Sequence, residues 1–182
     1  MSAPPSPGTV LEFWRAAGPD KWFARDEAFD AEIHARFLPT YEAAAAGELA
    51  RWSATAEGTL ALLVVLDQFP RNMFRGDARC YATDALARAV AHGAIARGFD
   101  RELAMADRRF IYLPFMHSED LRDQERGVTL LRQYGDEESA GYAEQHADII
   151  RRFGRFPHRN AILGRQTTAA EQAFLDAGGF SG

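Results

Sequence analysis

The run Leu60-Ala61-Leu62-Leu63-Val64-Val65-Leu66 is the longest uninterrupted apolar segment of the 182-residue chain, and Asp67-Gln68-Phe69-Pro70 follows it directly. The helix predicted over 57–68 is apolar on nearly every side, which is typical of a central element that its neighbours bury. Seven apolar residues are about a third of the ~20 that a membrane-spanning helix needs, so the segment predicts a core rather than a membrane span. We expect this helix to stop at Pro70.

The rest of the chain carries the same helical signal. Apolar residues recur at three- and four-residue spacing, valine and isoleucine are sparse, and no stretch reads convincingly as a strand. Further helices are expected at 9–15, 26–46 with a kink or break at Pro39, 83–97, 105–115, 118–134, 138–153 and after Thr168. Short connections make consecutive helices antiparallel, so the predicted fold is all-α, a single-domain stack of helical hairpins.

The predicted domain covers residues 9–177, because no linker or low-complexity segment divides the chain after residue 8. Residues 1–8 form a mobile lead-in and 178–182 a C-terminal tail. The lead-in lacks the basic start and apolar stretch of a signal peptide. A lone cysteine, Cys80, cannot form an internal disulfide, so a reducing cytoplasm is the predicted location.

Charge is unevenly distributed along the chain. The net charge of −5 disfavours general nucleic-acid binding or a membrane surface. Residues 119–148 carry nine acids and three arginines, a local charge of −6, whereas 149–170 carry five arginines and no acid, a local charge of +5. The two stretches either neutralise one another or leave an exposed basic patch that grips an anionic ligand. So short a basic patch on an acidic chain disfavours single-stranded nucleic acid as the ligand.

One motif occurs twice. Residues 67–72 read Asp-Gln-Phe-Pro-Arg-Asn, and 154–160 repeat Phe-Pro and then Arg-Asn, with the second phenylalanine 87 positions after the first. Each copy follows a helix, so each is expected to place an arginine and an asparagine in a loop. Two such loops are suited to binding a carboxylate or phosphate. The alternative is structural: phenylalanine in the core, asparagine bonding its own turn and arginine on a helix end.

Five strings carry a resemblance to a known family: Val10-Leu11-Glu12-Phe13-Trp14, Lys21-Trp22-Phe23, Leu66 to Asn72, Leu113 to Asp120 and Arg155 to Asn160. Through them the chain resembles the bacterial family called Domain of Unknown Function 924, over nearly its whole length from Val10 to Phe174. The resemblance implies an all-α, tetratricopeptide-like fold and no established activity.

Several polar residues stand on apolar faces. Asp67 enters a core and needs an arginine partner, either as a buried structural pair or as a carboxylate on the floor of a groove. His117 and Gln124 are spaced to face one cleft. Ser118 to Asp120 are expected to cap the next helix with acids that match its dipole. His146 is predicted to be a satisfied core histidine or to line a cleft.

Metal and cofactor motifs are missing from the sequence. Five scattered histidines and one cysteine show no zinc or di-iron spacing, and no glycine-rich phosphate loop occurs, so no metal or cofactor is predicted.

Three functions stay open. The first is a binding module for a small anionic molecule or peptide. Its groove would be lined by polar residues from the two repeated motifs and the region between them: Gln68, Arg71, Asn72, His117, Gln124, Arg155, His158, Arg159 and Asn160. The second is a small hydrolase or transferase with His117 or His158 as general base and arginines stabilising negative charge. The third is a structural or self-associating protein. The sequence leaves catalysis and the oligomeric state open.

Overall fold

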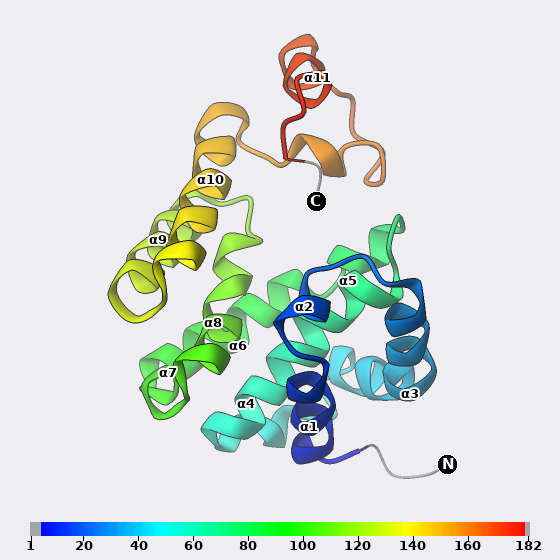
Figure 1. The fold of residues 1–182 in the computed structure, drawn as a ribbon, viewed down its shortest axis with the longest axis vertical. Coiled ribbons are helices and arrows are strands. Elements are labelled where there is room, and N and C mark those ends of the chain that lie inside the picture. The colour runs from blue at the N-terminus through cyan, green and yellow to red at the C-terminus, as the bar shows by residue number, and fades with distance from the viewer. Residues whose placement is uncertain (1–4, 181–182) are drawn as a thin grey trace. The chain divides into compact units, whose positions relative to one another are not determined.

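A computed structural model describes residues 5–180, and this part of the chain contains helices joined by turns and no strand (Figure 1). The all-α prediction is therefore confirmed. Residues 1–4 of the predicted lead-in and 181–182 of the predicted tail lie outside the described residues. None of the helices within 5–180 is both long enough and apolar enough to cross a membrane.

Contacts divide the chain into two compact units. Unit 1 comprises residues 1–75 and 79–114, and unit 2 comprises 76–78 and 115–182. The boundary after Pro114 falls inside a helix, α8 (Met105–Met116). No proline-, glycine- or serine-rich linker marks this boundary, so no local pattern indicates a division there.

Unit 1 holds the first eleven elements, apart from the first residue of η3 and the last two residues of α8. In chain order they are α1 (Pro7–Ala17), α2 (Pro19–Trp22), α3 (Glu27–Ala45), η1 (Ala50–Ala54), α4 (Ala56–Leu63), η2 (Val64–Gln68), α5 (Phe69–Met73), η3 (Ala78–Tyr81), α6 (Asp84–Ala96) and α7 (Phe99–Glu102), with α8 following. Figure 1 draws them in blue to green.

The apolar run forms the centre of unit 1, as predicted. Leu60, Leu63 and Leu66 are at most 1% exposed, and α1, α3 and α6 all pack on the run. Trp14 and Phe69 add an aromatic layer, with ring centroids 5.8 Å apart. Burial on all sides explains why the helix has no polar face.

The central helix does not end at Pro70, so that prediction is wrong. It passes through a π-helical turn, η2, into α5 and continues to Met73. Proline cannot donate to the carbonyl four residues back, which here belongs to Leu66. The Thr83 hydroxyl donates to that carbonyl at 2.6 Å instead, so the chain continues past proline without an orphaned acceptor.

Three other helix boundaries differ from prediction. The helix α1 begins at Pro7 because Ser6 rather than Thr9 is the N-cap, so part of the predicted lead-in is helical. Pro39 lies inside α3, so of the predicted kink or break the break is absent. In unit 2, α9 (Leu121–Tyr134) begins three residues after Ser118, because the Asp120 side chain is the cap.

Unit 2 is built on one helical hairpin. Only Gly135 and Asp136 separate α9 from α10 (Glu137–Phe153), and the two helices pack along their length. After α10 come the short turn η4 (Pro157–Arg159) and α11 (Ala169–Asp176). Gln124 of α9 is 1% exposed and its amide donates to the carbonyls of Met116 and Ser118 at 2.7 and 2.6 Å, so it fixes the chain that enters the hairpin.

Candidate functional site

The first Phe-Pro motif lies in a helix, not in the predicted loop. Arg71 of α5 donates to both carboxylate oxygens of Asp84 at 2.9 and 3.0 Å and lies 3.3 Å from the Asp67 carboxylate. Burial lowers the pKa of the Arg71 guanidinium, but Asp67 and Asp84 outweigh that effect and raise it. Asp67 is 1% exposed, so this is the buried structural Asp–Arg pair.

The two amides of this motif are also occupied. Gln68 donates to Asp67 at 2.6 Å, and Asn72 donates to Asp30 at 2.7 Å. Arg75 pairs with the same Asp30. The chain's own carboxylates thus satisfy the donors that were predicted to hold an anion.

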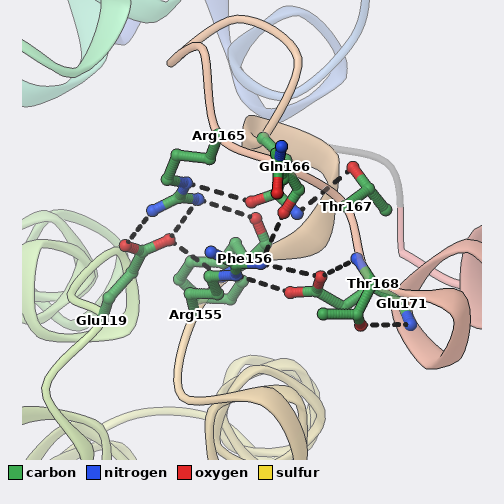
Figure 2. Close-up of polar contacts among 9 residues, drawn as sticks. Glu119, Arg155, Phe156, Arg165, Gln166, Thr167, Thr168 and Glu171 are labelled. Carbon is green, nitrogen blue, oxygen red and sulfur yellow. Dashed lines mark hydrogen bonds and ion pairs between the residues drawn. The ribbon is translucent and has the colours of Figure 1, made fainter.

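The second Phe-Pro motif is a turn that an acid of unit 2 holds in place (Figure 2). The Phe156 ring is fully buried, and its backbone N–H donates to Glu119 at 2.8 Å. Arg165 donates to both Glu119 oxygens at 2.7 and 3.0 Å and to the Phe156 carbonyl at 3.1 Å. Burial raises the pKa of Glu119. The hydrogen bonds from Arg165 and the Phe156 N–H lower this pKa by more, so it lies below its ordinary value.

A second ion pair ties the same turn to α11. Arg155 donates to both oxygens of Glu171 at 2.6 and 2.8 Å and to the Gln166 carbonyl at 2.8 Å (Figure 2). Glu171 is 2% exposed and also forms a capping box with Thr168. The hydrogen bond from Arg155 is the main reason why the pKa of Glu171 is lowered.

The arginine-rich stretch is therefore largely neutralised inside unit 2. Arg151 pairs with Glu144 and Asp148, while Arg155 and Arg165 pair with glutamates. Three of the acids, Glu119, Glu144 and Asp148, come from the acidic stretch of residues 119–148, and the last two lie on the same helix as Arg151, α10. The sequence left open whether the arginine-rich stretch is neutralised or forms an exposed basic patch. Arg151, Arg155 and Arg165 are neutralised.

His158, in the same turn, has a ring nitrogen, the buried Nδ1, that forms no hydrogen bond with the described residues. Burial lowers the pKa of His158 to about 3, and the charge of neighbouring Arg159 lowers it as well. A general base works best with a pKa near the working pH, so His158 is a weak candidate for the predicted hydrolase.

An aromatic residue near the end of the chain covers two histidines. The Phe180 ring centroid lies 4.4 Å from that of His146 and 5.1 Å from that of His158. His146 is 7% exposed and its Nδ1 pairs with the Tyr142 carbonyl at 2.8 Å, as expected for a satisfied core histidine. Phe180 itself is 38% exposed.

The nine predicted site residues fall into both units. Gln68, Arg71 and Asn72 lie in unit 1, and the other six in unit 2: His117, Gln124, Arg155, His158, Arg159 and Asn160. Arg159 is 6% exposed and stacks 4.5 Å from the Phe156 ring centroid. Asn160 is fully buried and accepts from Arg165 at 3.0 Å. The Gln124 amide bonds the backbone that enters the hairpin and does not line a cleft as predicted.

Four residues at this site were missed by sequence reasoning: Glu119, Arg165, Glu171 and Phe180. The pattern Thr168-x-x-Glu171 before a helix could have indicated Glu171. Glu119 bonds residues 37 and 46 positions away, so no local signal marks it. Residues 5–180 contain no group of three or more side chains able to hold a metal ion.

Comparison with known proteins agrees with the resemblance seen in the sequence. The model of the family described as "Bacterial protein of unknown function (DUF924)" matches residues 10–179. A solved structure of a protein of unknown function from Agrobacterium tumefaciens is 50% identical, with a TM-score of 0.91 over 94% of this chain and 97% of that one. No curated protein matches the chain. The chain belongs to the bacterial DUF924 family.

Proposed function

We propose that this protein is a binding module for a small anionic molecule, held at the second Phe-Pro turn of unit 2. The observation that carries the proposal is the buried Nδ1 of His158, which has no partner in the described chain. An unsatisfied buried polar atom costs about 1–3 kcal/mol, and native structures retain few of them. A ligand atom that pairs with this nitrogen would remove that cost.

The surroundings of His158 favour a negative charge on the ligand. Arg159, His146 and Arg165 all disfavour a proton on His158, whereas Glu119 alone favours it. A potential that repels a proton attracts an anion. The Phe180 ring packs against His158 and His146, so we propose that the ligand carries an aromatic group that replaces this ring.

The proposal can be tested by titration calorimetry with phenyl phosphate. Phe180→Ala removes the competing ring, and the affinity should rise about fivefold; His158→Phe removes the nitrogen, and the affinity should fall about tenfold. Phe23→Ala is the matched control, because Phe23 is an exposed aromatic of unit 1. Equal dissociation constants for the Phe180 and Phe23 variants would contradict the proposal.

The finer parts of the prediction extend this proposal. We propose a tetratricopeptide-like stacking of hairpins, of which the α9–α10 hairpin is the kind of unit required. We also propose a cytoplasmic location, because the lone cysteine, Cys80, is buried and forms no disulfide, as a reducing compartment favours. Cell fractionation tests the cytoplasmic location. The binding of phenyl phosphate to His158→Phe tests the ligand proposal alone, because it does not depend on the location or on the stacking of hairpins.

A further inference from the structure

The chain turns sharply where it leaves α11. The helix ends at Asp176, and the Gly179 N–H donates to the Phe174 carbonyl at 3.0 Å, which closes a turn directly after it. Gly178 has a φ of +77°, a left-handed conformation that glycine adopts far more readily than other residues. A Cβ atom on Gly179 would collide with the ring and the carbonyl oxygen of Phe174. This turn therefore requires two consecutive glycines.

The turn directs Phe180 onto the two histidines of the site in unit 2. The centroid of its ring lies 4.4 Å from that of His146 and 5.1 Å from that of His158, and Phe156 is also in contact at 6.5 Å. Phe180 forms no hydrogen bond with any other residue of the described chain, and 38% of it is exposed. Ring contacts alone hold this end of the segment, and such contacts are individually weak.

The helix before the turn is fixed much more firmly. Glu171 of α11 is buried and pairs with Arg155 through two hydrogen bonds. On the same helix, the Phe174 ring lies 5.2 Å from that of Phe153, and the Arg152 guanidinium stacks 5.1 Å from the Phe174 ring centroid. A hinge joins a fixed base to an end that can be released, and α11 and the Phe180 ring meet these two requirements.

We propose that residues 177–180 form a lid over the site of His146 and His158, which opens about Gly178 and Gly179 and which the ligand displaces. The identity of the ligand rests on the function proposed above, whereas the motion of the lid does not. In the closed form Phe180 occupies the place of the aromatic group of the ligand. The protein therefore binds its ligand only in the fraction of molecules whose lid is open, and that fraction sets the apparent affinity.

The motion is tested without any ligand, by NMR of the histidine ring signals. An aromatic ring displaces the signals of the groups packed against it, so Phe180→Leu gives the His146 and His158 positions of an uncovered site. Gly178→Val strains the turn, because a β-branched residue rarely adopts a positive φ. Both histidine signals should then move at least about halfway toward those positions. Gly47→Val is the matched control and should leave them in place, because Gly47 has a φ of +79° and open space around it but lies in unit 1.

The coupling of the lid to binding is tested by calorimetry with phenyl phosphate. Gly178→Val should bind this probe about fivefold more tightly than the unaltered protein does. Combining it with Phe180→Ala should give no further gain over Phe180→Ala alone, because both substitutions remove the same obstacle. Circular dichroism of Gly178→Val should show an unchanged helix content, since the substitution follows α11 and replaces no helical residue.

Two results would overturn the inference. One is a pair of histidine signals in Gly178→Val that coincide with those of the unaltered protein, or that Gly47→Val moves equally far. The other is an additive gain in affinity in the double variant, which would mean that the glycine turn does not act through Phe180. If the histidine signals move as expected but phenyl phosphate binds to none of the proteins, the lid is supported and the proposed ligand is wrong, so the two failures are distinguishable.

Discussion

Glu119 accepts hydrogen bonds from the Phe156 N–H and from both arms of Arg165. Glu119→Gln keeps the shape of the side chain but removes its charge, so two charge-assisted bonds weaken. We expect the free energy of unfolding to fall by about 2 kcal/mol, measured by urea denaturation.

Glu125→Gln supplies the matched control, because Glu125 is an exposed acid of α9 and its substitution should change stability by less than about 0.5 kcal/mol. If the two substitutions cost the same, Glu119 does not organise the Phe-Pro turn. Hydrogen exchange of the Phe156 amide, measured in the Glu119 and Glu125 variants, shows whether the stability is lost at the Phe-Pro turn.

His158 makes stability depend on pH in a defined window. Its folded pKa of about 3 lies below its ordinary value of 6.5, so the unfolded chain binds the extra proton. The neutral His158 therefore contributes its full share of the free energy of unfolding above pH 6.5, and this share is lost as the pH falls from 6.5 toward 3. Between pH 6.5 and 5 this amounts to a loss of about 2 kcal/mol, which His158→Phe should abolish in urea titrations. Parallel pH profiles for the two proteins would contradict it.

At the scale of elements, the approach of η1 to α4 requires a glycine. A Cβ atom at Gly58 would collide with the Trp52 carbonyl oxygen, which is backbone and cannot swing away. Gly58→Ala should therefore lower the free energy of unfolding by about 2 kcal/mol, measured by thermal or urea denaturation.

Gly141 of α10 is the opposite case, since a Cβ there meets open space. Gly141→Ala should raise stability by about 1 kcal/mol, because alanine favours the helix. A gain of stability in both variants would mean that helix propensity, and not the contact with Trp52, governs Gly58.

The helices were predictable where their signals are local. Asp26 and Thr168 cap α3 and α11 as the sequence indicated, and Gly18 ends α1. Prediction failed where a distant group intervened: Pro70 is tolerated because Thr83, 17 residues away along the chain from Leu66, serves the carbonyl that proline cannot. Sequence spacing carries no information about such partners.

At the scale of the whole molecule, the predicted single domain implies that both units unfold together. All three tryptophans, Trp14, Trp22 and Trp52, lie in unit 1, so their fluorescence reports on that unit alone. Circular dichroism in the far ultraviolet reports helices of both. We expect one shared midpoint in urea. A fluorescence transition displaced from the dichroism transition would show two independently folding domains.

The candidate site shows the same limit on a larger scale. The repeated Phe-Pro motif was visible in the sequence, but the ion pairs that hold its second copy in place are formed by Arg155 and Arg165, on either side of Arg159. Their partners could not be named, because Glu171 stands outside the arginine-rich stretch and Glu119 had a sufficient local explanation as a helix-capping acid. Pairing across tens of residues follows from tertiary packing, which local periodicity does not encode.

The π-helical turn between α4 and α5 sets the register of everything that follows it. Such a turn accommodates one residue more than an α-helix does. Loss of a single residue within 64–68 would relax the turn to an ordinary α-helix and leave Phe69 and Arg71 on the faces that they occupy now. One inserted residue would exceed what the turn accommodates and would rotate both side chains by about 100° about the helix axis. This short stretch should therefore tolerate a single deletion better than a single insertion.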